Sequence, residues 1–134
     1  METVFEKLYT FYGMRTLEEA DPEFHPYYEG VMEKRDMAYH QGTVWTFPLG
    51  AYYLAYLKVH AYSERAKQDV KEQLEVLECA LKEGCIGQLP EIYDGKNPVS
   101  SKGCFAQAWS VGELLRVYEQ IEKRRNRTWN LKGE

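Results

Sequence analysis

The sequence contains little cysteine and little histidine. Its three cysteines among 134 residues form an odd and sparse set, whereas a disulfide-bonded scaffold usually has an even and dense one. We therefore expect reduced thiols and a cytoplasmic protein. The three histidines lie far apart, and no histidine or cysteine pair has the spacing of zinc ligands. The sequence predicts no disulfide framework and no metal site, and it suggests no nucleotide or redox cofactor.

Excess basic charge and long hydrophobic runs are also missing. Lys and Arg total 17 against 21 Asp and Glu, which gives a formal net charge of −4. Proteins that bind nucleic acid through its phosphates normally carry a basic patch, so this class is disfavoured. The apolar stretch from Thr43 to Leu57 contains Pro48 and is shorter than the about 20 residues that span a bilayer. The first residues also lack the cationic and apolar regions of a signal peptide. We expect no nucleic acid and no membrane as partners.

Aromatic residues are abundant in this sequence. They make up 14% of the chain, beside 44% hydrophobic and 28% charged residues. This composition and the chain length suit a single globular domain. Aromatic rings with polar tips serve in cores with wet edges and as flat faces for ligands. Composition alone leaves both uses open.

Four helices are expected, joined by long loops that contain glycine. Pro48 fits the first turn of a helix that is apolar on most sides and therefore buried. Ser63 can cap a second long helix, half-solvated, which Gly84 would end. The helix expected at the start of the chain carries a capping box of Thr3 and Glu6. The expected helices cover about residues 3–12, 47–61, 63–84 and 105–123, with irregular loops over 13–42 and 85–103.

The alternation of buried, polar and buried helices predicts an all-α fold. A two-layer helical toroid has this pattern, because its inner helices are apolar and its outer helices are amphipathic. About four helices cannot close such a ring. We therefore expect either a compact bundle or one piece of a larger toroid.

Two of the loops carry polar side chains among aromatic ones. Amide, imidazole, carboxylate and indole groups suit a sugar site, because hydroxyls need polar partners and the C–H faces of a pyranose pack on aromatic rings. In the loop that ends near residue 45 and in the loop around residues 84–110, the candidates are His40, Gln41, Trp45, Gln88, Glu91, Gln107 and Trp109.

These candidates also have ordinary structural explanations. Taken alone, Glu91 is a solvated loop carboxylate. Asp36 and Asp94 are rival carboxylates, and each could hold a loop by accepting bonds from backbone N–H groups. Arg15 could pair with a carboxylate or with a sugar hydroxyl. Structural packing or pairing remains the alternative for His40, Trp45 and Trp109. Glu113 sits on an expected helix and is interpreted as a structural partner.

Four segments in a fixed order carry more specific information. They are residues 13–17 (GMRTL), 39–45 (YHQGTVW), 88–95 (QLPEIYDG) and 103–111 (GCFAQAWSV). They resemble the GLRTL, YHxGTVWPW, xxSEIFDGD and GCxAQAWSVAELLR blocks of the amylo-α-1,6-glucosidase domain of bacterial and archaeal glycogen debranching enzymes. The chain departs from these blocks at Thr46-Phe47, where the family commonly has Pro-Trp, and at Lys96-Asn97, where it often has an acidic residue.

The resemblance implies part of an (α/α)6 toroid that hydrolyses the α-1,6-linked glucose at glycogen branches with inversion. Inverting enzymes use a general acid and a general base about 6.5–9.5 Å apart. The family's base corresponds to Glu91, and its acid lies upstream of this chain. We therefore expect residues 1–134 to be one C-terminal segment of a glycosidase domain, inactive alone, with an α-glucan as the parent's substrate. The expected sugar contacts are Arg15, His40, Gln41, Trp45, Gln88, Gln107 and Trp109.

A second function class remains open. The chain could be a non-catalytic helical module that oligomerises or binds α-glucan. The apolar helices expected at 44–61 and 105–115 would leave a large apolar patch in an isolated fragment, and such patches usually mark association surfaces. We therefore expect a homo-oligomer if the chain is isolated.

Overall fold

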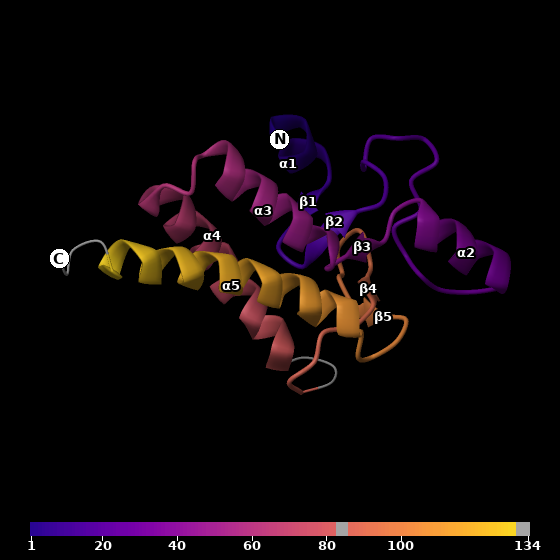
Figure 1. Ribbon diagram of the computed structural model, residues 1–134. Helices are drawn as coiled ribbons and strands as arrows, with labels where there is room; N and C mark the ends of the chain where they lie inside the picture. Colours follow the sequence, from indigo (N-terminus) through magenta and orange to yellow (C-terminus); the bar gives the residue numbers. More distant parts are fainter. Residues whose placement is uncertain (83–85, 131–134) are drawn as a thin grey trace.

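The computed structural model describes residues 1–82 and 86–130, with side chains to residue 122. In these ranges, five α-helices and a short 3₁₀ helix accompany a five-stranded sheet (Figure 1). The helices are α1 (Glu2–Lys7), α2 (Met32–His40), α3 (Pro48–Val59), α4 (Glu64–Glu78), η1 (Cys79–Lys82) and α5 (Ala108–Asn130). The strands are β1 (Tyr9–Thr10), β2 (Gly13–Arg15), β3 (Val44–Trp45), β4 (Ile92–Tyr93) and β5 (Ser101–Lys102).

The sheet is an antiparallel meander in the order β1-β2-β3-β4-β5. Met14 pairs with Trp45, and Trp45 pairs with Ile92. The prediction of an all-α fold, a partial (α/α)6 toroid of about four helices, is therefore wrong. Strands of two or three residues are too short to show the alternation of apolar and polar residues that indicates a strand in a sequence. Their pairing depends on contacts between distant segments of the chain.

The hydrophobic core lies among three helices. α3 packs against both α5 and α4, and each helix contributes buried aliphatic side chains to one cluster. The predicted proline start of α3 is confirmed, because Pro48 occupies its first turn. The expected burial on most sides is wrong, because Ala51, Ala55 and Val59 are exposed and only one side enters the core. The cluster includes Leu49, Tyr53 and Leu57 from α3, Val70, Leu74 and Leu77 from α4, and Leu114, Val117 and Ile121 from α5.

The predicted helix boundaries need several corrections. Ser63 does cap α4, since its hydroxyl accepts a bond from the Ala66 N–H, but the α-helix ends at Glu78 and a 3₁₀ turn follows. The expected stop at Gly84 lies outside the described residues. α1 ends at Lys7 instead of residue 12, and no side chain caps its start. The last helix begins at Ala108 instead of residue 105.

Two features of the first loop were not predicted. The segment after α1 turns into the β1–β2 hairpin, in which Gly13 approaches β3 so closely that a Cβ would lie 2.2 Å from the Trp45 carbonyl oxygen. The stretch 13–42 also contains α2, which is exposed on most sides and buries only Ala38 fully. A helix without an apolar stripe gives no periodic signal.

Candidate active site

The sheet brings the four sequence blocks together. β2 lies in block 13–17, β3 in block 39–45 and β4 in block 88–95, while β5 directly precedes block 103–111. Neighbouring strands are hydrogen-bonded, so blocks that are distant in sequence lie side by side. Figure 1 shows the sheet beside the first turns of α5. Any shared site of these blocks must lie here.

The two loops that carry the candidates converge. The Gly95 N–H donates to the Pro26 carbonyl at 2.7 Å, and the Tyr28 N–H donates to Asp94 Oδ1 at 3.0 Å. Asp94 is buried, and Lys102 Nζ lies 3.8 Å from its other oxygen. Asp94 therefore holds the first loop against the second, which is the structural explanation considered for it.

Glu91 is bound at both carboxylate oxygens. Oε1 accepts a bond from the Tyr39 hydroxyl at 2.5 Å, and Oε2 accepts one from the Cys104 N–H at 2.9 Å. The Glu91 N–H in turn donates to the Cys104 carbonyl at 2.8 Å. Gly103, with φ +71°, passes so near that a Cβ would lie 2.5 Å from Glu91 Oε2. The carboxylate is held between α2 and the segment that leads into α5.

These contacts keep Glu91 ionised. Partial burial by itself raises the pKa of its carboxyl, but the bonds from the Tyr39 hydroxyl and from Cys104 outweigh burial and place the pKa below its ordinary value. Burial and the neighbouring carboxylate raise the pKa of Tyr39 to about 12. At neutral pH the pair is therefore a carboxylate and a protonated phenol. In the described part of the chain, no Lys or Arg forms an ion pair with Glu91.

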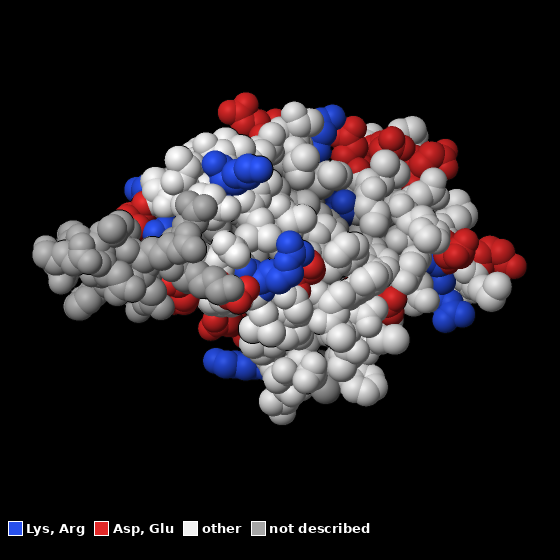
Figure 2. Space-filling model, in the orientation of Figure 1, with Lys and Arg blue, Asp and Glu red and all other residues white. Residues whose placement is uncertain are grey.

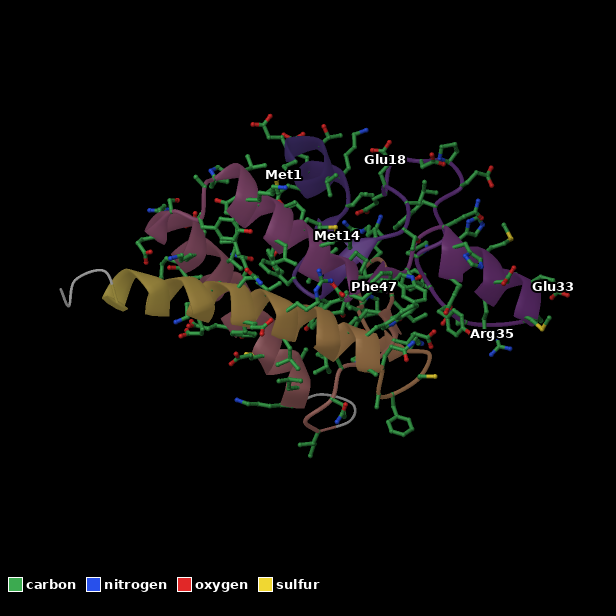
Figure 3. All side chains as sticks on the ribbon, in the orientation of Figure 1. Met1, Met14, Glu18, Glu33, Arg35 and Phe47 are labelled. Atoms are coloured by element: carbon green, nitrogen blue, oxygen red, sulfur yellow. The ribbon has the colours of Figure 1, made fainter. Side chains whose placement is uncertain are left out.

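An aromatic cluster adjoins the carboxylate. The Trp45 ring meets the Tyr39 ring edge-on at 4.7 Å, and Phe47 stacks on Trp109 at 4.6 Å. Trp45 is buried, whereas Trp109 is 48% exposed. Figure 3 labels Phe47 beside the first turns of α5, and Figure 2 shows a largely uncharged surface over this end of α5. Phe47 thus supplies an aromatic face where the chain departs from the family block.

Three candidates from the first two blocks make their hydrogen bonds and ion pairs away from Glu91. Arg15 donates from Nε to the Gly95 carbonyl at 2.8 Å, so it holds the second loop. His40 is exposed on α2, and its Nε2 lies 3.8 Å from a carboxylate oxygen of Asp36. The backbone carbonyl of Gln41 accepts the His25 N–H. None of these three side chains forms a hydrogen bond with Glu91.

The remaining candidates flank Glu91 along the chain. The Gln107 N–H donates to the Leu89 carbonyl at 2.8 Å, which places its backbone beside the segment that precedes Glu91. Gln88 is exposed. Glu113 pairs with Arg116 at 2.5 Å and packs against Gly50, where a Cβ would lie 2.7 Å from its own Cβ. Glu113 is a structural partner of α3, as expected.

Sequence reasoning did not single out Tyr39, Phe47, Gly103 or Cys104 as site residues. Tyr39 and Cys104 stand 52 and 13 residues from Glu91, the side chain they bind. No periodicity or spacing rule connects positions that a sheet brings together. The only available signal was that Tyr39 opens one of the four blocks and that Gly103 and Cys104 open another.

In the described residues no group of His, Cys, Asp or Glu is arranged to hold a metal ion, and no described helix has the length and apolar character needed to cross a membrane.

Comparison with known proteins agrees with the four blocks. No curated protein sequence matches the chain. The family model of amylo-alpha-1,6-glucosidase matches residues 1–116. The chain therefore belongs to the amylo-alpha-1,6-glucosidase family, as the resemblance of its four blocks predicted.

Proposed function

We propose that this chain is the C-terminal segment of a larger catalytic domain, and that Glu91 is the general base of that domain. The family implies an α-glucan as the substrate of the parent enzyme. The proposed reaction is inverting hydrolysis of α-1,6-linked glucose at branch points. One observation carries the proposal: Glu91 of one block accepts hydrogen bonds from two other blocks, next to aromatic rings.

The chemistry of inversion assigns a single proton transfer to Glu91. A water molecule lies between the base and the anomeric carbon. As the water oxygen bonds to that carbon, the glycosidic C–O bond breaks and the base takes the proton of the water. The leaving oxygen takes a proton from a general acid, which must come from polypeptide outside residues 1–134. A base must be ionised before the reaction, and the lowered pKa of Glu91 meets this condition.

Trp109 and Phe47 are the proposed contacts for the glucosyl ring. Their stacked rings leave Trp109 half-exposed, and a C–H face of a sugar packs on such a surface. Gln88 and Gln107 are proposed partners for hydroxyl groups. His40, Gln41 and Trp45 remain predicted sugar contacts, whereas the bond of Arg15 to the Gly95 carbonyl favours a loop-holding role.

The test is Glu91→Gln in the full-length protein that contains residues 1–134. Glucose release from a limit dextrin should fall by about 10²–10⁴-fold, the usual contribution of a general base. Dextrin binding should be retained, since the substitution preserves shape. Asp36→Asn is the matched control and should leave the rate unchanged, because Asp36 is exposed on α2. Normal hydrolysis by Glu91→Gln would refute the assignment of Glu91 as the base. Debranching by residues 1–134 alone would refute the proposal that the general acid comes from polypeptide outside these residues.

A non-catalytic function is the second candidate, and a separate cavity favours it. A cavity of about 850 Å³ lies among α1, α3 and α4. Tyr56 and His60 line it with ring centroids 4.3 Å apart, and Tyr9 donates to Gln73 Oε1 at 2.8 Å. Rings with an amide and a carboxylate (Asp69) nearby also suit a glucan.

Glycogen binding by the isolated chain separates the two candidates. Mobility in a gel that contains glycogen should respond to Trp109→Ala if the Glu91 region binds the glucan. It should respond to Tyr56→Ala instead if the cavity does. Self-association through the exposed Trp109 and Leu115 of α5 is a further proposal, and sedimentation of the wild type and of Leu115→Glu tests it. A cytoplasmic location stays a prediction.

A further inference from the structure

Tyr39 is the one side chain of α2 that reaches into the site. Most of this helix is exposed, but Tyr39 lies half-buried in its last turn next to the buried Ala38. Its ring is fixed on two sides, edge-on against Trp45 at 4.7 Å and beside Tyr28 at 6.0 Å.

The backbone around Tyr39 is fixed as well. The Thr43 N–H donates to the Ala38 carbonyl at 3.0 Å, and the Thr43 hydroxyl donates to the Tyr39 carbonyl at 3.1 Å. Thr43 is fully buried and directly precedes β3. The position of the Tyr39 hydroxyl is therefore tied to the sheet.

The Glu91 carboxylate has one donor on each oxygen. Tyr39 binds Oε1 and the Cys104 N–H binds Oε2. A carboxylate oxygen has two lone-pair sites. The Cys104 thiol is a further donor to this carboxylate, and the remaining lone pairs are free for another partner. The two donors come from segments on either side of the carboxylate, and together they determine which way these free sites point.

We propose that Tyr39 is a positioning residue for the general base: its hydroxyl donates to Glu91 Oε1, orients the carboxylate and stabilises its ionised form. This inference rests on the proposed role of Glu91. Tyr39 keeps its own proton throughout the reaction. The proton of the attacking water goes to a free lone pair of Glu91, so no proton passes through the phenol.

The titratable groups around the pair are few. In the described residues, Tyr39 faces the carboxyl from α2 and Cys104 faces it from the segment before α5. Tyr28 faces Tyr39 from the first loop, with the Arg35 guanidinium 5.8 Å from the Tyr28 ring centroid. The pKa of Tyr39, raised to about 12, keeps its hydroxyl a donor at every pH at which a glycosidase works. A change in Glu91 titration after loss of this hydroxyl can therefore be attributed to the lost bond.

The first experiment measures the Glu91 carboxyl directly. The chain of residues 1–134 is labelled with ¹³C at glutamate side chains, and Glu91→Gln identifies the Glu91 signal. Tyr39→Phe keeps the ring and removes the hydroxyl, and it should raise the pKa of Glu91 by about one unit. Tyr28→Phe is the matched control, since it removes a neighbouring hydroxyl that has no recorded bond to Glu91, and should leave that pKa unchanged. An unchanged Glu91 titration in Tyr39→Phe would overturn the inference.

A reciprocal measurement covers the case in which Tyr39→Phe does not fold. In Glu91→Gln, the pKa of Tyr39 should fall below that in the wild type, because the charge that raises it is gone. Tyrosine ring NMR measures this value. A Tyr39 titration unaffected by Glu91→Gln would overturn the inference as well.

The second experiment separates this inference from the proposed function. In the full-length protein, the acid limb of the kcat/KM–pH profile should move upward in Tyr39→Phe by the same amount as the Glu91 pKa. A shifted Glu91 pKa with an unmoved acid limb would overturn Glu91 as the base, and with it the catalytic importance of Tyr39. An unmoved Glu91 pKa would overturn only the role of Tyr39.

Discussion

Gly103→Ala tests the way in which the carboxylate is held. Gly103 has φ +71°, and its added Cβ would lie 2.5 Å from Glu91 Oε2 and 3.1 Å from Glu91 Cβ. The oxygen belongs to the end of a side chain, so rotation would normally relieve the clash. Here Tyr39 and the Cys104 N–H bind the two oxygens. The side chain cannot rotate without losing one of these bonds.

Two contributions add up in this variant. The left-handed backbone conformation costs an alanine about 1–2 kcal/mol. Loss of a hydrogen bond to a charged group costs about 1.5–3 kcal/mol, and partial exposure of Glu91 places the value at the lower end. We therefore expect Gly103→Ala to lower the free energy of unfolding by about 3 kcal/mol.

Gly87→Ala is the matched control. Gly87 has a similar φ of +78°, but an added Cβ meets no atom of the described residues within 4 Å. We therefore expect only the backbone contribution of about 1–2 kcal/mol. Urea unfolding of residues 1–134 measures both variants on one baseline. Equal losses in the two variants would refute the conclusion that Glu91 is held rigidly at Oε2. The ¹³C titration of Glu91 in Gly103→Ala should also show a higher pKa, because the Cys104 bond is disturbed.

Three further predictions concern stability. Gly112 is an exposed helical position in α5, where an added Cβ meets no atom of the described residues within 4 Å. Gly112→Ala should therefore raise the free energy of unfolding, measured in urea, by about 0.5–1 kcal/mol. A destabilised variant would contradict the open surface there. Ser63→Ala should lower it by about 1 kcal/mol, since the hydroxyl caps α4, whereas Ser63→Asp should keep most of the stability. The pKa of Glu91 lies below its ordinary 4.5, so its stabilising contribution is present above about pH 4.5 and is lost as the pH falls through the folded-state value. The stability difference between the wild type and Glu91→Gln should therefore shrink from pH 7 to pH 3, and a constant difference would count against the lowered pKa.

The helices could be predicted from the sequence because their signals are local. Pro48 and Ser63 mark helix starts through the chemistry of the first turn. In α4, Ala66, Val70, Leu74 and Leu77 recur at helical spacing and enter the core. α2 has no such stripe, so its sequence resembles a solvated loop. Local signals thus predicted the helices that build the core and missed the helix that carries Tyr39.

The site could not be predicted from local signals. Each strand contributes two or three residues, and its partner is chosen by the rest of the fold. Resemblance to known blocks identified Glu91, but it gave no account of what the carboxylate binds. The contact between Tyr39 and Glu91 depends on the pairing of β3 with β4, which no spacing along the chain reveals.

Core and site occupy different parts of this chain, and this separation has a consequence. The aliphatic cluster is built mainly by α3, α4 and α5, with Met14 of β2 and Leu89 joining it, whereas Glu91 is held by hydrogen bonds among loop segments and α2. Hydrogen bonds of this kind each contribute about 0.5–3 kcal/mol, and several of them, including those of Asp94 and Arg15, hold the same loops. A substitution such as Leu74→Ala should therefore lower the free energy of unfolding, while the orientation of Glu91 in the folded protein stays the same. Tyr39→Phe, in contrast, should alter the carboxylate while the core stays packed. Titration of Glu91 therefore reports on the site alone, whereas unfolding in urea sums the contributions of core and site.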